Sequence, residues 1–193
     1  MERQEKWLVA GSMLEWIGPF SKDLAWWQVP LAIEKPIQEL VARVRHDRQP
    51  ETGERRNTWV RNGVRALFAG GRGPDKTLAA LHVARAVDMP LYRVDLVRVV
   101  SQYIGDTEKN LDRVFGTATE AGAILFFDEA DALFGERDAA KGSNDRYGNL
   151  EWAYLIRNIE AFRGIVILAS NSRERIDPTF LRRFEVAVTF EHL

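Results

Sequence analysis

Apolar residues are spaced along this chain in two alternating patterns. Short stretches rich in apolar residues predict strands over residues 65–69, 92–96, 123–128, 165–169 and 186–190, and residues 123–127 are apolar throughout, as suits a strand buried on both faces. Apolar positions that recur every three or four residues predict helices over 34–48, 76–87, 107–121, 151–162 and 177–184. Strands that alternate with helices favour an α/β fold with a doubly wound, parallel, five-stranded sheet. Ligands of such sheets bind at the carboxyl ends of the strands.

The first 33 residues are rich in aromatic side chains, namely Trp7, Trp16, Phe20, Trp26 and Trp27. We interpret this segment as a short element that packs against the core or a neighbouring subunit, because aromatic side chains bury large apolar areas. A platform for a cofactor or a peptide is the alternative. The pattern therefore predicts an N-terminal segment over residues 1–33 and a core over residues 34–193.

The composition is that of a globular protein. The 193 residues carry a formal net charge of −1, which argues against nucleic acid as a partner. There is no cysteine, so thiol catalysis and thiolate metal sites are excluded. No apolar run is long enough to span a bilayer, and the N-terminus lacks a signal-peptide pattern. We therefore expect a cytoplasmic protein without a membrane partner.

A glycine-rich loop follows the first strand of the predicted core and leads directly into a helix. It runs Gly70-Gly71-Arg72-Gly73-Pro74-Asp75-Lys76-Thr77, with Leu78 next, and matches the pattern G-x-x-x-x-G-K-[ST] at all fixed positions but one. In such loops backbone N–H groups cradle phosphate. The lysine reaches the β- and γ-phosphates, and the hydroxyl binds Mg²⁺. Residues 70–78 are therefore predicted to bind ATP, with Thr77 as a magnesium ligand.

Asp75 stands where the pattern requires its last glycine. Its side chain occupies a position at which backbone must approach phosphate closely, and its carboxylate repels a polyanion. We expect weakened nucleotide binding, unless Asp75 turns outward to solvent. Taken alone, this segment is equally well interpreted as a glycine-rich turn before a helix.

The third predicted strand ends in two carboxylates, Asp128 and Glu129. An aspartate at a strand tip holds Mg²⁺ in many phosphoryl-transfer sites. The adjacent glutamate can polarise the attacking water as a general base. Acidic pairs at strand ends are often only solvated, but one that follows a phosphate loop in this strand–helix order favours a catalytic role. Asp131 is interpreted as structural or as a helix cap.

Three further features lie at later strand or helix ends. Asn171 ends the fourth predicted strand, where its amide can position water or a γ-phosphate oxygen; a turn residue is the alternative. Arg182 and Arg183 end the last predicted helix, where they either complement the helix dipole or reach a neighbouring subunit's γ-phosphate. Tyr103 lies on a loop, as a contact to a partner or as a cover over the core.

Taken in order, these segments resemble the AAA branch of the AAA+ ATPase family. Ser101–Leu111 is similar to that branch's pore-loop segment, and Leu168–Asn171 to its sensor 1 strand. The chain is most similar to bacterial AAA ATPases encoded with phage-tail-like contractile injection systems, through Tyr103–Leu111, Asp128–Gly135, Asp145–Tyr147 and Phe180–Phe184. The resemblance covers roughly residues 34–190.

For the nucleotide site, the resemblance implies a P-loop NTPase fold that binds and hydrolyses ATP with Mg²⁺. It assigns Lys76 and Thr77 to the phosphates and the metal, Asp128 to the metal, and Glu129 to the attacking water. Asn171 would be sensor 1.

For assembly, the resemblance implies a ring, usually a hexamer, that acts on a protein partner. Arg182 and Arg183 would be arginine fingers, and Tyr103 would be the pore aromatic that grips a threaded polypeptide. The family's helical lid would follow the core, and the sequence ends at Leu193 before it.

Two functions remain open at this stage. A motor that hydrolyses ATP to remodel or assemble a protein partner is favoured by Glu129, Asn171 and Arg182. A hydrolysis-deficient scaffold or interaction module is favoured by Asp75 and by the absent lid. A DNA-acting loader is a third possibility, opposed by the neutral net charge.

Overall fold

The computed structural model describes residues 13–18, 27–47, 63–71, 73–99, 106–130, 145–171 and 181–191. Its strands are β1 (Leu14–Gly18), β2 (Val64–Gly70), β3 (Leu91–Val94), β4 (Ile124–Phe127), β5 (Ile165–Ser170) and β6 (Val186–Phe190). Its helices are α1 (Leu31–Asp47), α2 (Gly73–Val87), α3 (Leu96–Val99), α4 (Asp106–Ala121) and α6 (Asp145–Ala161). The predicted α/β alternation is confirmed in these residues.

The strands form one sheet in the order β1-β3-β4-β5-β2-β6. From β3 to β6 all neighbours pair in parallel, as predicted. The sheet has six strands rather than five, because β1 adds to the β3 edge in the antiparallel direction. The register shifts between Trp16 and Gly18, which disturbs the alternation that would have revealed this short edge strand. The predicted boundary between the N-terminal segment and the core, at residues 33 and 34, stays a prediction.

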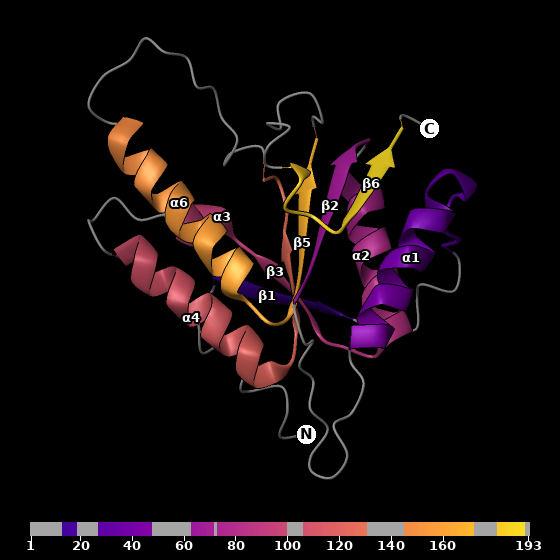
Figure 1. Cartoon of the computed structure of the whole chain (residues 1–193), viewed down its shortest axis with the longest axis horizontal. Coiled ribbons are helices and arrows are strands. Elements are labelled where there is room, and N and C mark those ends of the chain that lie inside the picture. The colour runs from indigo at the N-terminus through magenta and orange to yellow at the C-terminus, as the bar shows by residue number, and fades with distance from the viewer. Residues whose placement is uncertain are drawn as a thin grey trace.

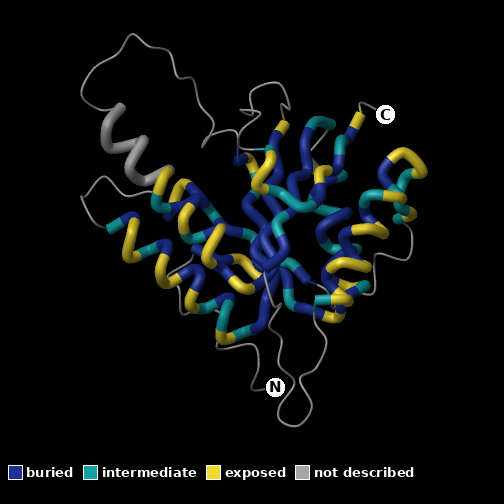
Figure 2. Tube along the Cα trace, viewed as in Figure 1, coloured by how far each residue is buried: buried dark blue, intermediate teal, exposed yellow. Residues whose placement is uncertain are grey.

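Helices cover both faces of the sheet. Figure 1 shows α4 and α6 on one side and α1 and α2 on the other. Each face has its own buried cluster: Phe115 of α4 and Phe127 of β4 belong to one, and Phe68 of β2 and Val83 of α2 to the other. The strands between them are buried, as Figure 2 shows, and β4 and β5 are buried at every residue. The central strands are therefore enclosed between two layers of helices.

The parallel strands bring their carboxyl ends to one edge of the sheet. Because β5 lies between β4 and β2, residues that follow these three strands become neighbours despite their distance in sequence. At the opposite edge, Arg65 and Glu185 join β2 to the start of β6. The Arg65 N–H donates to the Glu185 carboxylate over 2.7 Å, and the two side chains form an ion pair. The amino ends of β2 and β6 are thereby held in register.

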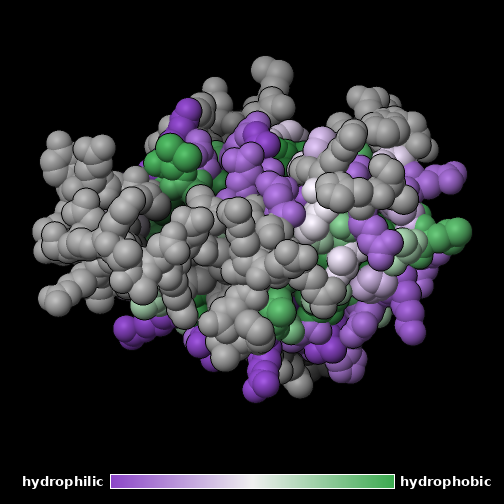
Figure 3. All heavy atoms as spheres, turned by 90° about the horizontal axis from the view of Figure 1, so that it is seen from above, coloured by the Kyte–Doolittle hydropathy of each residue, from purple (hydrophilic) through white to green (hydrophobic). Residues whose placement is uncertain are grey.

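Apolar side chains on the outside are scattered rather than gathered. The large exposed ones in the described part of the chain are Trp16, Leu31 and Val97, on three different elements. Figure 3 looks onto the carboxyl edge of the sheet and shows apolar patches separated by hydrophilic side chains. Among the described helices, none is both long and apolar enough to cross a membrane.

Candidate functional site

The glycine-rich loop leaves β2 against the end of β6. Gly70 and Gly71 have φ angles of 80° and 61°, which side chains rarely adopt. A Cβ at Gly70 would lie 2.5 Å from the carbonyl oxygen of Phe190, and one at Gly71 would lie 2.6 Å from the Phe190 Cβ. The loop therefore packs directly against the end of β6, which leaves no room for side chains at Gly70 and Gly71.

The helix after the loop begins earlier than predicted. α2 starts at Gly73, three residues before Lys76, so part of the predicted loop is helical. Pro74 suits the first turn of a helix, and Asp75 places a negative charge near the positive end of the helix dipole. With no glycine at position 75, nothing interrupts this early start. Asp75 is half-buried, so it does not turn fully into solvent.

Lys76 is the most deeply buried charged residue of the site, with 1% of its surface exposed. Its ammonium donates hydrogen bonds to the Gly70 carbonyl over 2.7 Å and to the Asn171 amide oxygen over 2.9 Å. The Gly71 carbonyl lies 3.4 Å away. Thr77 and Leu78, the next two residues of α2, are half-buried. The structure thus brings the predicted phosphate-binding lysine and the predicted sensor into direct contact.

The acidic pair follows β4 as a tight turn. The Glu129 N–H donates to the Asp128 carboxylate over 2.9 Å, and Glu129 adopts a left-handed φ of 52°. The Ala130 N–H then donates to the Ala169 carbonyl of β5 over 2.8 Å. Asp128 is half-buried and Glu129 is exposed, so the glutamate carboxylate faces solvent at the carboxyl edge. Asp131 lies outside the described residues.

The acidic turn and the glycine loop are close but not in contact through any described bond. β4 and β2 flank β5, and neighbouring strands lie about 4.8 Å apart, so the two strand tips are separated by about 10 Å. Asn171, at the end of β5, stands between them.

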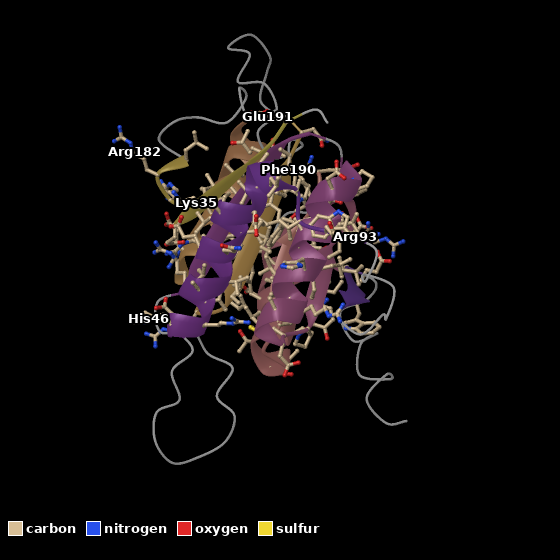
Figure 4. The ribbon with its side chains drawn as sticks, turned by 90° about the vertical axis from the view of Figure 1, so that its right-hand side faces the viewer. Lys35, His46, Arg93, Arg182, Phe190 and Glu191 are labelled. Carbon is tan, nitrogen blue, oxygen red and sulfur yellow. The ribbon has the colours of Figure 1, made fainter. Side chains whose placement is uncertain are left out.

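The two predicted arginine fingers behave differently. Arg183 forms an ion pair with Glu160 near the end of α6, and the Glu160 carbonyl accepts a hydrogen bond from Arg65 at the start of β2. Arg183 is therefore held at the amino edge of the sheet, away from the chain's own phosphate loop. Arg182 is exposed, and Figure 4 shows it extending away from the body. Neither arginine reaches the site of its own chain.

Some predicted residues lie outside the described part of the chain, namely Arg72, Tyr103 and residues 177–180 of the last predicted helix. Gly73 and Pro74 lie in the first turn of α2. Sequence reasoning missed Phe190, which Figure 4 places at the upper end of β6. Its only signal was its position as the last residue of an apolar run.

The side chains present suit a magnesium ion that is shared with a nucleotide. Mg²⁺ is usually held by one or two carboxylates together with phosphate oxygens and water. Asp128 and the Thr77 hydroxyl supply hard oxygen ligands of this kind. In the described ranges, no group of three or more metal-ligating side chains could hold an ion by itself. The residues therefore fit Mg²⁺ that arrives with a phosphate, and Asp75 is the one member that does not fit.

Known proteins with similar sequences include one named as an AAA family ATPase. The chain is 34% identical over 125 residues to the uncharacterized AAA family ATPase y4kL of Sinorhizobium fredii, covering 65% of this chain and 38% of that protein. It is 34% identical over 138 residues to the cell division cycle protein 48 homolog of Archaeoglobus fulgidus, covering 70% of this chain and 18% of that protein. The chain thus spans well under half the length of these relatives.

Solved structures show the same fold. The FIGL-1 AAA domain in complex with ADP superposes with a TM-score of 0.64 at 18% identity, covering 98% of this chain and 62% of that chain. A chain in the structure of the E. coli MS115-1 HORMA:CdnC:Trip13 complex superposes with a TM-score of 0.57 at 22% identity, covering 81% of this chain and 60% of that chain. The model of the ATPase family associated with various cellular activities matches residues 66–192, more than half of the chain. The chain therefore belongs to the AAA family of ATPases.

Proposed function

We propose that this chain is the ATP-binding core of an AAA ATPase that hydrolyses ATP to remodel or assemble a protein partner, and that Asp75 weakens its nucleotide site. The observation that carries the proposal is the convergence of Lys76 and Asn171 beside the acidic turn. A buried ammonium in the first turn of a helix, at the carboxyl end of a parallel sheet, is an arrangement suited to binding phosphate.

In this proposal residues 70–78 bind the phosphates, and Lys76 supplies the positive charge. Thr77 and Asp128 hold Mg²⁺, which supplies charge neutralisation at the phosphates. Glu129 accepts the proton of the attacking water, because it is the exposed carboxylate of the acidic turn. Asn171 orients the phosphate end of the substrate.

Asp75 affects the site through both backbone and charge. The early start of α2 converts loop residues into helix, so fewer backbone N–H groups are free to cradle phosphate. The Asp75 carboxylate also lies in the helix turn where a phosphate would be stabilised by the dipole. Both effects lower affinity, so we expect binding that is weak rather than absent.

Assembly belongs to the same proposal. Arg182, exposed and directed away from its own chain, is the arginine that acts on a neighbour's nucleotide in a ring. Arg183 positions the turn through Glu160 instead. Tyr103 is proposed to contact the protein partner. The protein is proposed to be cytoplasmic. A link to contractile injection systems is proposed on the sequence resemblance alone.

Binding of a fluorescent ATP analogue with Mg²⁺ tests the nucleotide site. Lys76→Ala should reduce affinity at least about tenfold, since a charge-assisted hydrogen bond to phosphate contributes about 1.5–3 kcal/mol. Asp75→Gly should tighten binding, and Asp75→Asn should recover only the part due to charge. If Lys76→Ala binds as well as the wild type, the nucleotide site is elsewhere.

Turnover tests the role of Glu129. Glu129→Gln should keep the nucleotide bound while reducing the hydrolysis rate by about 10²-fold or more, because a positioned general base contributes about 10²–10⁴-fold. Release of inorganic phosphate from the oligomer is the measurement. Undiminished release would remove Glu129 from the mechanism.

A hydrolysis-deficient scaffold is the second candidate, and the early start of α2 at Gly73 favours it. It predicts no measurable binding by the wild type and restored binding by Asp75→Gly. Binding by the wild type together with the loss of turnover in Glu129→Gln would exclude it.

A further inference from the structure

The ammonium of Lys76 is already bound by oxygen atoms of the protein. The Gly70 carbonyl, the Asn171 amide oxygen and, more distantly, the Gly71 carbonyl surround it at 2.7, 2.9 and 3.4 Å. An ammonium has three donors and no acceptor. A phosphate oxygen that binds Lys76 must therefore displace an acceptor that is present before any nucleotide arrives.

The three acceptors differ in how easily they can leave. The two glycine carbonyls belong to a backbone in left-handed conformation that is wedged against Phe190. The Asn171 oxygen lies at the end of a side chain, on a residue that is otherwise exposed. Rotation about side-chain bonds is sufficient to withdraw it, whereas the carbonyls require a change of the loop. Asn171 is thus the acceptor that a phosphate displaces first.

An amide is suited to both states of such an exchange. Its oxygen can accept from the ammonium, and its NH₂ group can donate to a phosphate oxygen after rotation. A carboxylate of the same shape would hold the ammonium more strongly and would repel phosphate.

We propose that Asn171 is a latch on Lys76, which closes the phosphate site in the nucleotide-free chain and opens when a phosphate oxygen replaces its amide oxygen. The proposal rests on the proposed nucleotide-binding function and adds regulation to the same site. In it Asn171 first competes with nucleotide for Lys76, and only afterwards contacts the terminal phosphate. Removal of the side chain has opposite consequences for these two roles.

ADP separates the two roles, because it lacks a γ-phosphate for Asn171 to contact. Calorimetric titration of the full chain with ADP and Mg²⁺ should show about fivefold tighter binding for Asn171→Ala than for the wild type, since the competing charge-assisted bond is gone. Asn171→Asp should bind ADP about tenfold more weakly. Asn158→Ala, which removes an amide bound to Tyr154 on α6, is the matched control and should bind like the wild type. Unchanged or weaker ADP binding by Asn171→Ala would overturn the latch.

A second measurement needs no nucleotide. In urea unfolding, Asn171→Ala should lower the midpoint more in the wild-type background than in a Lys76→Met background, because the latch requires both groups. Equal shifts in the two backgrounds would refute the latch. If this coupling is present and neither the wild type nor Asp75→Gly binds ADP, the Lys76–Asn171 contact stands and the proposed nucleotide-binding function fails, whereas ADP binding by the wild type that does not tighten in Asn171→Ala overturns the latch alone.

Discussion

Gly71 faces Phe190 so closely that a Cβ on the glycine would lie 2.6 Å from the Phe190 Cβ. The need for glycine at this position thus originates within the fold, from the approach of the loop to the end of β6. In a phosphate loop, glycine is usually explained by the approach of backbone to the ligand. Here the packing of the loop against Phe190 requires glycine at position 71 even when no ligand is bound.

Replacing Gly71 with alanine should therefore destabilise the nucleotide-free chain. A left-handed alanine costs about 1–2 kcal/mol, and the collision with Phe190 adds to this. We expect a loss of about 2 kcal/mol in the free energy of unfolding, measured in urea without nucleotide.

Gly116 provides the matched control for Gly71. It lies within α4, and a Cβ there would meet nothing within 4 Å. Gly116→Ala should stabilise the chain by about 0.5–1 kcal/mol, because glycine is a poor helix former. Equal effects of the two substitutions would show that the loop is not held by β6.

The link between Arg65 and Glu185 should contribute more to stability than the exposed ion pair of Glu15 and Arg93. Their side chains are only 17% and 24% exposed, and the Arg65 backbone N–H also donates to the carboxylate. Glu185→Ala removes several charge-assisted bonds and should cost about 2 kcal/mol. Thermal or urea unfolding measures this loss.

Glu15, paired with Arg93 across β1 and β3, is the comparison for Glu185. The Arg93 and Glu15 side chains are 41% and 59% exposed, and surface pairs of this kind contribute about 0–1 kcal/mol. Glu15→Ala should therefore cost less than half of what Glu185→Ala costs. The reverse order would mean that the β2–β6 link does not hold the sheet together.

Arg182 and Arg183 should separate assembly from stability. Arg182→Ala should leave the unfolding free energy within about 0.5 kcal/mol of the wild type, as expected for an exposed residue, and should reduce turnover only in the proposed ring. Arg183→Ala breaks the pair with Glu160 and should lower stability by up to about 1 kcal/mol. Monomer unfolding and turnover in mixed rings provide the two readouts. A loss of stability in Arg182→Ala alone would contradict this division.

His82 should make stability depend on pH on the acidic side of neutrality. Its ring packs on Trp27 with 5.9 Å between centroids. Burial, and then the neighbouring Arg85, lower the pKa of His82 below its usual 6.5. The neutral form is therefore favoured by folding. Its contribution to stability is present above about pH 6.5 and is lost as the pH falls through the folded pKa.

A non-titrating ring at position 82 tests this dependence. His82→Phe keeps an aromatic partner for Trp27 and should show a smaller loss of stability between pH 7.5 and pH 5.5 than the wild type. His46, exposed on α1, is the control, and His46→Gln should retain the wild-type dependence. The same pH profile in His82→Phe and the wild type would remove His82 as the cause.

The fold was largely predictable because its strands are hydrophobic runs and its helices are amphipathic. The edge strand β1 was not, since five residues with a register shift carry little pattern and their partner lies far along the chain. For the candidate site, the sequence was sufficient to predict which residues lie at the ends of strands and what chemistry their side chains offer. Their contacts were not predictable: the bond from Lys76 to Asn171 and the wedge of Phe190 depend on where side chains point, and sequence spacing does not determine that direction.

Glu129 adopts a backbone conformation that suits glycine or asparagine better than glutamate. A sequence chosen for folding alone would place one of those residues after Asp128, and Glu129→Gly would relieve about 1 kcal/mol of strain. That substitution would also delete the carboxylate proposed to activate water. In the proposed mechanism, stability and chemistry therefore make opposing demands on this single position, and glutamate satisfies the demand of the chemistry.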